Sequence, residues 1–357
     1  MSSRGRHVRP LCSGEGHGPG IRDVLILGIE SSCDETSVAL VEDGRRVRAS
    51  VVASQIDLHA RYGGVVPELA ARAHIECLVP VMNEALQAAD VAVADVDAIA
   101  VVNMPGLIGS LLIGVTAAKT LAWIHDKPLV AVNHIQAHPY AVCLDNDIEP
   151  WPCVSLVVSG GHTTLYHSTG PLEIQRIGRT VDDAAGEAFD KVAAILELPY
   201  PGGPSIDRLS KQGNPKALAF KRSAVGPEQL DFSFSGIKTA VLYEVCGHDL
   251  SRTAASMSDD RKADIAASFQ EAVVDMLVAN TMRAAELRAA ETVVLGGGVA
   301  ANGRLRTKMA EAACRRGLVC HVPPLKYCTD NAAMVAGLAH HMILDGRTAD
   351  LAFEAKA

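Results

Sequence analysis

Short apolar runs and longer amphipathic stretches alternate along the chain from Val24 onward, and the short runs end in glycine or polar residues. Such runs predict strands, whereas apolar residues spaced three or four apart predict helices. Strands are expected at 23–32 and on both sides of Asp43-Gly44, a dipeptide that favours a tight hairpin turn. A helix at 68–89, a strand at 96–103, a glycine loop at 104–110, a helix at 110–125 and a strand at 128–133 follow.

The same order of elements returns in the second half of the chain. A strand, a glycine turn and two further strands are expected from Cys153 to Gly178. Repetition of one supersecondary plan suggests duplication, and alternating strands and helices predict α/β layers. We therefore expect two lobes with a cleft between them, lined by glycine loops at strand ends. The remaining predicted elements are helices at about 182–197 and 261–289, a strand with its glycine loop at 291–300, a helix at 302–316, a strand at 318–323 and a helix at 329–342.

Composition and charge narrow the classes of function. The chain has 357 residues, 48% of them hydrophobic, which is enough for two lobes with their own cores. A formal net charge of −8 argues against a general polyanion binder, so nucleic-acid contact would need a local basic patch or a partner. The sequence contains no run of 18 or more apolar residues, so it predicts no membrane-spanning helix. Nine cysteines without a CxxC pair are typical of reduced thiols in a cytoplasmic protein.

Residues 1–23 differ from the rest of the chain. They are rich in Gly, Arg and Ser and lack the apolar core of a secretory signal. We expect a disordered leader or a start codon assigned too early. The duplication divides the remainder into an N-terminal lobe at 24–139, a C-terminal lobe at 140–346 and a tail at 347–357.

Two histidines suggest a metal site. His134 and His138 stand four positions apart after an apolar run, and on a helix that step places both rings on one face. Asp330 opens the last helix of the second half, at the place that the histidines occupy in the first half. Pseudo-symmetry would bring all three side chains to the cleft, where two His and one carboxylate leave metal positions open for substrate. A plain helix cap is the alternative role for Asp330.

Two turns at strand ends are candidates for phosphate contact. Asp34 and Glu35 follow the first strand and could orient a metal or water near a phosphate, although a polar hairpin turn explains them equally. In the equivalent turn of the second half, Ser159, Gly160 and Gly161 could present backbone N–H groups to a phosphate. An ordinary hairpin turn is the alternative there.

Further polar positions could bind a nucleoside. Asp183, Glu187 and Asp190 share one face of the helix at 182–197, which a solvated acidic face with a Glu187–Lys191 pair would also explain. Gly203 could lie close to a ligand and Asp207 could accept from ribose hydroxyls, unless this segment is only a helix entry. Asn302 follows a triple-glycine loop and could cap the next helix or contact an adenosine.

Taken in order, these motifs resemble one family. GIESSCDETS, the HxxxH pair, VSGGHT, GEAFDKVA, YPGGPSID, FSFSGIKTAV, GGGVAAN and CTDNAAM occur in the sequence of motifs typical of the TsaD family, the bacterial tRNA adenosine threonylcarbamoyltransferases with relatives in the KEOPS complex. The resemblance covers Val24 to about Gly346. It implies a duplicated, two-lobed α/β fold like that of actin, sugar kinases and Hsp70 (ASKHA), with a nucleotide cleft between the lobes.

The resemblance also implies a reaction and its site. The family transfers threonylcarbamoyl from threonylcarbamoyl-AMP to the N6 amine of the adenosine 3′ of the anticodon, in tRNAs that read ANN codons. The implied partners are tRNA, a TsaB-like paralogue and a TsaE-like ATPase, and the implied location is the cytoplasm. One divalent metal, Fe2+ or alternatively Zn2+, would be held by His134, His138 and Asp330. The implied substrate contacts are Val157, Val158, Ser159, Gly160, Gly161, Asp190, Gly203, Asp207 and Asn302.

The chain departs from the family pattern at three positions. Pro139 follows the second histidine and disfavours helical geometry at His138. Met104 replaces a usual glycine, which would make that loop less open. Val157 stands where archaeal relatives have a tyrosine that is a metal ligand.

Three other functions compete with the transferase reading. A zinc peptidase would need HExxH, but Ile135 follows His134. A small-molecule kinase of the same fold and a non-catalytic scaffold stay open on fold grounds, and the metal triad argues against both.

Overall fold

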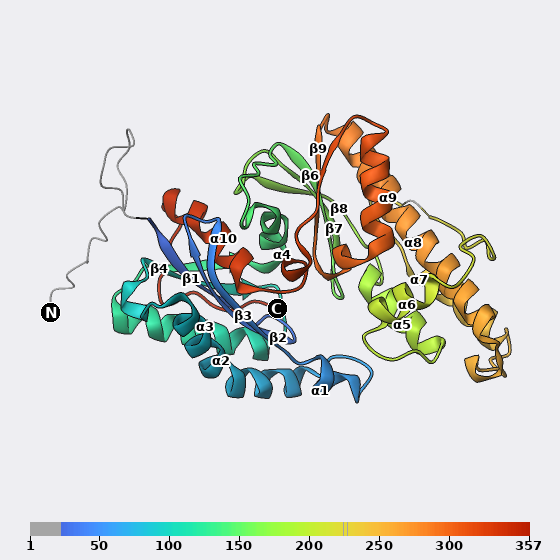
Figure 1. Ribbon diagram of the computed structural model, residues 1–357, viewed down its shortest axis with the longest axis horizontal. Helices are drawn as coiled ribbons and strands as arrows, with labels where there is room; N and C mark the ends of the chain where they lie inside the picture. The colour runs from blue at the N-terminus through green and yellow to red at the C-terminus, as the bar shows by residue number, and fades with distance from the viewer. Residues whose placement is uncertain (1–22, 224, 227) are drawn as a thin grey trace.

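The computed structural model describes residues 23–357 except 224 and 227, so the predicted leader lies outside the described residues apart from Asp23. It contains two five-stranded sheets, each accompanied by its own helices, and the two halves lie side by side (Figure 1).

The first sheet has the strand order β3-β2-β1-β4-β5. β1, β2 and β3 form an antiparallel meander, whereas β1, β4 and β5 are parallel. The meander turns at Asp43 and Gly44, which both have positive φ, as the sequence predicts for a tight hairpin. The strands are β1 Leu25–Glu30, β2 Glu35–Glu42, β3 Arg46–Ser54, β4 Ala98–Met104 and β5 Leu129–Asn133.

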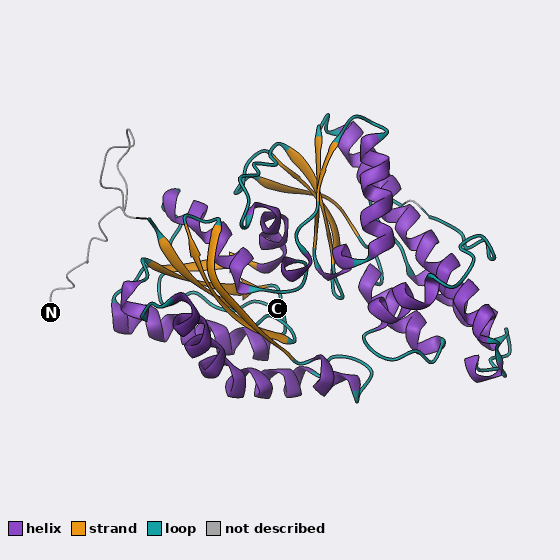
Figure 2. Ribbon diagram, viewed as in Figure 1, coloured by secondary structure: helices purple, strands orange, loops and turns teal. Residues whose placement is uncertain are grey.

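Helices cover both faces of this sheet (Figure 2). α2 (Pro67–Ala89) and α3 (Ile108–His125) pack with Leu25, Leu27 and Ile29 in one core. α10 (Ala332–Leu344) packs against the opposite face, in a core that includes Ile26. Burial on both faces explains why Leu25–Ile29 of β1 and Val38–Val41 of β2 are continuous apolar runs instead of alternating. Two short helices precede and follow α2, namely α1 Ile56–Ala60 and the 3-10 helix η1 Val93–Asp95.

The second sheet has the order β10-β9-β6-β7-β8 and the same pattern of antiparallel meander and parallel pairs. The predicted duplication is therefore confirmed. The strands are β6 Cys153–Val158, β7 Thr163–Ser168, β8 Ile174–Arg179, β9 Thr292–Gly296 and β10 Val319–His321. The helices of this half are α5 Ala185–Ile195, α6 Gly202–Ser210, α7 Ser235–Cys246, α8 Asp259–Leu287 and α9 Gly303–Cys314, with 3-10 helices η3 Ala254–Ser256, η4 Gly298–Ala301 and η5 Leu325–Tyr327.

One core joins the two halves. α4 (His134–Ala137) and the 3-10 helix η2 (His138–Cys143) leave β5 and reach the second sheet, where η2 contacts β6 and β9. The same core contains residues of η2, of the second sheet and of α10. α10 thus packs on the first sheet although it lies within 140–346, and the division of the chain at 139 and 346 stays a prediction.

Candidate metal centre and cleft

A short helix holds both histidines. Asn133 ends β5 and caps α4, because its Oδ1 accepts hydrogen bonds from the backbone N–H groups of Ile135 at 3.0 Å and Gln136 at 3.1 Å. Pro139 lacks the N–H that would continue the α-helical ladder, and the chain passes into the 3-10 helix η2 at His138. His138 itself keeps φ −57 and ψ −44, so the helix changes type without breaking. The two rings meet edge to face with their centroids 4.8 Å apart.

Asp330 joins these histidines, as the sequence predicts. His134 Nε2 and His138 Nε2 are 3.3 Å apart, and Asp330 Oδ1 lies 3.5 Å from the first and 3.3 Å from the second. Three ligand atoms at tetrahedral angles around one ion, each at roughly 2.1 Å, would be about 3.4 Å apart. The donor types and their spacing therefore fit one divalent transition metal.

The capping alternative for Asp330 is wrong. Asn331 is the cap of α10, because its Oδ1 accepts from the backbone N–H of Met334 at 3.0 Å. The preceding Asp330 stands outside the helix, and its carboxylate is therefore available to the histidines. The sequence alone does not distinguish these neighbours, since Asp and Asn are equally good caps.

The three groups influence one another's protonation strongly. Burial alone would lower the pKa of His134, but the carboxylates of Asp330 and Glu30 outweigh burial and raise the pKa to about 9. Burial lowers the pKa of His138. Burial alone would raise the pKa of Asp330, but the two histidines hold it well below its usual range. Without metal, the cluster is therefore a protonated His134 beside an ionised Asp330.

Two further residues of this centre were missed by the sequence reasoning. Glu30, at the end of β1, is fully buried and accepts a hydrogen bond from His134 Nδ1 at 2.9 Å. His162 follows the glycine turn of the second half, and burial, followed by the charges of His134 and His138, lowers its pKa to about 4. Both belong to motifs of the predicted site, but a sequence does not show which way their side chains turn.

Asp34 and Glu35 lie at the β1–β2 turn, beside the metal triad. Burial, then the charges of Asp330 and Asp34, raises the pKa of Glu35 to about 10. The raised pKa favours the protonated form of Glu35, which can donate a hydrogen bond to an anionic ligand.

The glycine turn after β6 is open to its surroundings. A Cβ at Gly160 or Gly161 would meet nothing within 4 Å. Ser159 anchors the turn to α5, since its carbonyl accepts from the backbone N–H of Gly186 at 3.1 Å. Val157 and Val158 have no exposed surface, whereas the two glycines are open, and substrate contact by these residues stays a prediction.

The candidate nucleoside residues lie on α5, α6 and α9. Asp190 accepts from the backbone N–H of Gly202 at 2.7 Å and thereby ties α5 to the start of α6. Gly203 is open, with nothing within 4 Å of an added Cβ. Asp207 pairs with Lys211 at 3.1 Å, and its carboxylate lies about 4 Å from a Cβ built on Gly303. Asp207 of α6 therefore lies near Gly303, the first residue of α9.

Some acidic and amide groups have the structural roles named as alternatives. Asn302 caps α9 through the N–H of Leu305 at 3.0 Å, and its Nδ2 donates to Gln270 at 2.8 Å. Lys191 pairs with Glu187 at 2.7 Å and with Asp183 at 3.0 Å, as the acidic-face reading predicts. The sequence around these residues is therefore compatible with both a ligand-binding and a purely structural role.

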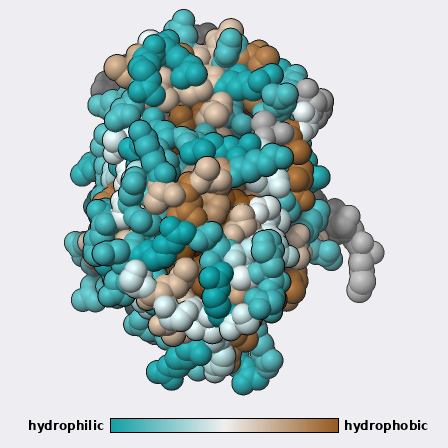
Figure 3. Space-filling view, turned by 90° about the vertical axis from the view of Figure 1, so that its right-hand side faces the viewer, coloured by the Kyte–Doolittle hydropathy of each residue, from teal (hydrophilic) through white to brown (hydrophobic). Residues whose placement is uncertain are grey.

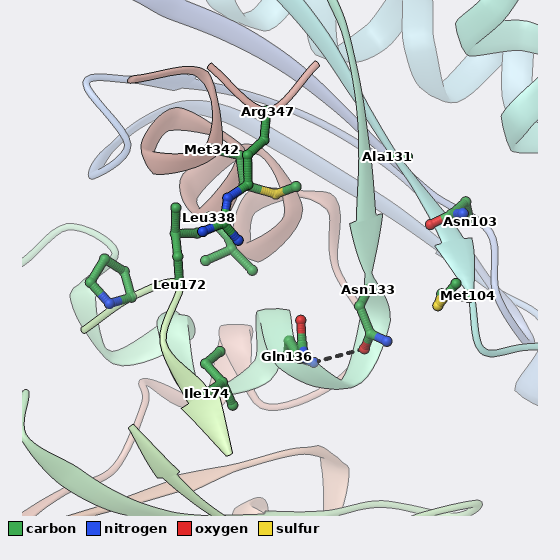
Figure 4. A pocket seen from close by; sticks show the side chains of 11 residues that line it. Asn103, Met104, Ala131, Asn133, Gln136, Leu172, Ile174, Leu338, Met342 and Arg347 are labelled. Carbon is green, nitrogen blue, oxygen red and sulfur yellow. Dashed lines mark hydrogen bonds between the residues drawn. The ribbon is translucent and has the colours of Figure 1, made fainter. Parts of the chain in front are cut away.

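A cavity of about 240 Å³ lies beside α4 (Figure 4). Met104 lines it, so this departure from the family pattern borders the cavity. Gln136 of α4 also lines it, whereas none of the predicted metal or substrate residues does. The other lining residues are Asn103, Ala131, Asn133, Pro171, Leu172, Ile174, Leu338, Met342 and Arg347.

The comparisons with solved structures agree with this architecture. HypF of T. kodakarensis superposes with a TM-score of 0.60 at 16% identity, over 92% of this chain and 49% of that chain. Component A of the Acidaminococcus fermentans (R)-2-hydroxyglutaryl-CoA dehydratase gives a TM-score of 0.50 at 17% identity, over 90% of this chain and 99% of that chain. At such identities the likeness shows the fold alone, and that fold is the two-lobed ASKHA type.

Sequence comparison defines the family more closely. The family model described as TsaD, tRNA N6-adenosine threonylcarbamoyltransferase, matches residues 46–337. A relative with that same name from Symbiobacterium thermophilum is 50% identical over 93% of this chain and 95% of its own length. Another from Moorella thermoacetica is 49% identical over 92% of this chain and 95% of its own length. The chain belongs to the TsaD family.

The protonation of His134 predicts how metal affinity depends on pH. A metal must displace the proton of His134 below about pH 9. Affinity should therefore rise about tenfold per pH unit through the neutral range and level off above that pKa. Competition with a chelator of known affinity, at several pH values, measures this slope. A pH-independent affinity would show that His134 is already neutral in the metal-free protein.

Proposed function

We propose that this protein transfers the threonylcarbamoyl group from threonylcarbamoyl-AMP to the N6 amine of the adenosine 3′ of the anticodon, in tRNAs that read ANN codons. The observation that carries the proposal is the convergence of His134, His138 and Asp330 in a chain of the TsaD family. The reaction is acyl transfer: the amine nitrogen forms a bond to the carbamoyl carbon, the bond from that carbon to the phosphate oxygen breaks, AMP leaves, and the amine loses one proton.

The reaction does not require a nucleophilic side chain from the protein. The donor is a mixed anhydride and AMP is a good leaving group, so no Ser-His-Asp triad is needed. A divalent ion held by His134, His138 and Asp330 would supply Lewis-acid stabilisation at the phosphate or the carbonyl oxygen. The donor set suits both Fe2+ and Zn2+, and we propose Fe2+ as the resident ion.

The chain's own residues would hold the adenylate. We assign phosphate contact to the open turn at Gly160 and Gly161, and to the neutral carboxylic acid of Glu35. A neutral Glu35 avoids the repulsion that a carboxylate would exert on the phosphate. Asp207 and the open face at Gly203 would receive the nucleoside, with Asp190 and Asn302 positioning α6 and α9 around it.

The basic residues that could form a local patch for tRNA are few and dispersed, and most of them form ion pairs within the chain. Arg45 pairs with Glu149 at 2.6 Å, and Arg46 and Arg48 pair with Glu42. Arg222, Arg304 and Lys308 pair with Glu271 or Asp275. Ion pairs of this kind supply little net positive field for a polyanion. We infer that tRNA binding depends on helper subunits, a TsaB-like paralogue and a TsaE-like ATPase.

The first lobe offers an apolar surface for the paralogue. α2 and α3 contact each other and expose the apolar side chains of Ile75, Val79, Leu112, Trp123 and Ile124. Trp123 is 73% exposed, and large exposed aromatics are typical of interfaces. The opposite end of the molecule, around α7 and α8, is mainly hydrophilic (Figure 3). We therefore place the paralogue on α2 and α3.

The apolar composition of α3 also bears on the location of the protein in the cell. α3 is the one described helix long and apolar enough to cross a membrane by length and composition. It packs against β4 and α2 along one side and exposes Leu112, Trp123 and Ile124 on the other. We propose a cytoplasmic protein that makes no membrane contact.

The first test is reconstitution. The protein is incubated with tRNA, threonine, bicarbonate, ATP, the helper subunits and the separate synthase that makes the donor, and digested tRNA is examined for the modified nucleoside. His138→Ala should lose at least about 10–100-fold in metal affinity and activity, since even changes around a metal ligand have that effect. His321→Ala, a change on β10, should keep both. Full metal content in His138→Ala, measured by elemental analysis, would contradict the assignment of the metal to His134, His138 and Asp330.

A second test concerns the adenylate. Gly203→Ala should weaken AMP binding by about 1–3 kcal/mol, because the added methyl group fits the free protein and would collide with a ligand at that face. Calorimetry measures the affinity, and thermal unfolding should be unchanged. Gly236→Ala is the matched control, since Gly236 is also the second residue of its helix and is equally open. Equal AMP affinities in both variants would place the adenylate elsewhere.

A third test concerns the partners. The isolated chain should turn over poorly, and cognate TsaB-like and TsaE-like subunits with ATP should restore cycling. Trp123→Glu should abolish co-elution with the paralogue in size-exclusion chromatography, because a charge in an apolar interface is left unpaired. Tyr243→Glu, an exposed aromatic of α7, should not. Many turnovers by the chain alone at physiological salt would contradict the partner requirement.

A further inference from the structure

Glu30 is a buried carboxylate with two specific partners. It is the last residue of β1 and has no exposed surface. Its Oε2 accepts from His134 Nδ1 at 2.9 Å, and its Oε1 accepts from the backbone N–H of Ser32 at 2.5 Å. Burying a charged carboxylate is unfavourable unless it is paired and hydrogen-bonded, so this arrangement needs a reason.

We propose that Glu30 is the positioning residue of the metal centre, which fixes the ring orientation of His134 and keeps its proton on Nδ1. This inference rests on the proposed function only in that His134 is taken as a metal ligand. With the proton on Nδ1, the lone pair of Nε2 faces His138 and Asp330, where the metal would be held. Carboxylates that orient a ligating histidine in this way also raise its basicity.

Glu30 is itself held by the loop between β4 and α3. The carbonyl of Ser32 accepts from the backbone N–H of Leu107 at 2.8 Å. A Cβ at Gly106 would lie 2.6 Å from that same carbonyl oxygen, so only glycine permits the approach. Ser32 in turn donates its N–H to Glu30, and with the proton of His134 on Nδ1 its hydroxyl oxygen is a second acceptor at 3.2 Å. Gly106 therefore supports the metal centre indirectly. It permits the close contact with Ser32, and Ser32 in turn contacts Glu30 and His134.

Two other nearby histidines, His138 and His74, are held differently from His134. His138 Nδ1 has no hydrogen-bond partner among the described residues, so only one of the two ligating rings is directed by a carboxylate. His74 donates from Nε2 to the carbonyl of Cys33 at 2.9 Å, and its Nδ1 accepts from Thr36 at 2.7 Å. His74 thus has its proton on Nε2, the opposite of the tautomer that we propose for metal-binding His134.

The test is Glu30→Gln, which keeps the size of the side chain. A glutamine has one acceptor oxygen, but two donors, Ser32 N–H and His134 Nδ1–H, compete for it. Either one donor loses this acceptor, which for His134 leaves only the longer contact with Ser32 Oγ at 3.2 Å, or the His134 proton moves to Nε2 and blocks the metal. We expect metal affinity to fall about 10–100-fold. It is measured by chelator competition with Zn2+ alone, and the visible spectrum of the Co2+-substituted protein reports the change in ligand geometry.

Thr36→Val is the matched control. Thr36 is buried in the same hairpin and contacts the Nδ1 atom of a buried histidine, but it does not contact the metal triad. This variant should lose stability and keep its metal affinity. The inference is overturned if Glu30→Gln binds Zn2+ within about twofold of the parent, or if Thr36→Val loses as much affinity. Where Glu30→Gln does not fold, Glu30→Asp retains the charge but shortens the reach, and the same two outcomes apply.

These measurements do not depend on catalysis. A parent protein that binds Zn2+ normally but modifies no tRNA would contradict the proposed function and leave the role of Glu30 intact. A parent that modifies tRNA while Glu30→Gln keeps its Zn2+ affinity and Co2+ spectrum would contradict only the role of Glu30.

Discussion

The packing of α10 against β1 is the constraint on which the metal centre depends. A Cβ at Gly28 would lie 2.5 Å from the carbonyl oxygen of Ala332, so the first turn of α10 rests directly on the strand. The N–H of Ala332 also donates to Ser37 of β2 at 3.0 Å. These contacts fix the start of α10, and Asp330 immediately precedes it. The carboxylate therefore reaches two histidines almost two hundred positions earlier in the chain because a helix of the second half docks on the first sheet.

The sequence was sufficient for most strands and long helices, although not for α1, α6 and α7, and for the convergence of the three candidate metal ligands. Apolar periodicity predicted the strands and helices, and the repeated plan indicated that His134, His138 and Asp330 would meet. That argument works because pseudo-symmetric halves place equivalent strand ends at one cleft. It needs no side-chain geometry, which is why it succeeded.

The sequence was not sufficient where a contact joins distant residues. Glu30 looks like the polar end of a strand, and its partner His134 lies 104 positions away. Arg45 looks free for phosphate, yet Glu149, also 104 positions away, neutralises it. Asp330 and Asn331 are both good helix caps, and only the observed start of α10 decides between them. In each case the local residue type permits two partners, and the choice is made by tertiary packing.

The pairing of the basic side chains has a thermodynamic consequence. A cation that already holds a carboxylate must give it up, or share it, to hold a phosphate. Binding of a polyanion there would exchange one ion pair for another and would release few condensed counterions per contact. Logarithmic plots of affinity against salt should then be shallow compared with those of proteins whose arginines are free. Selectivity between nucleic acids would in that case come from shape and from groove or loop geometry. The carboxylates of the protein already neutralise these basic side chains, which weakens their uniform attraction to any phosphate chain.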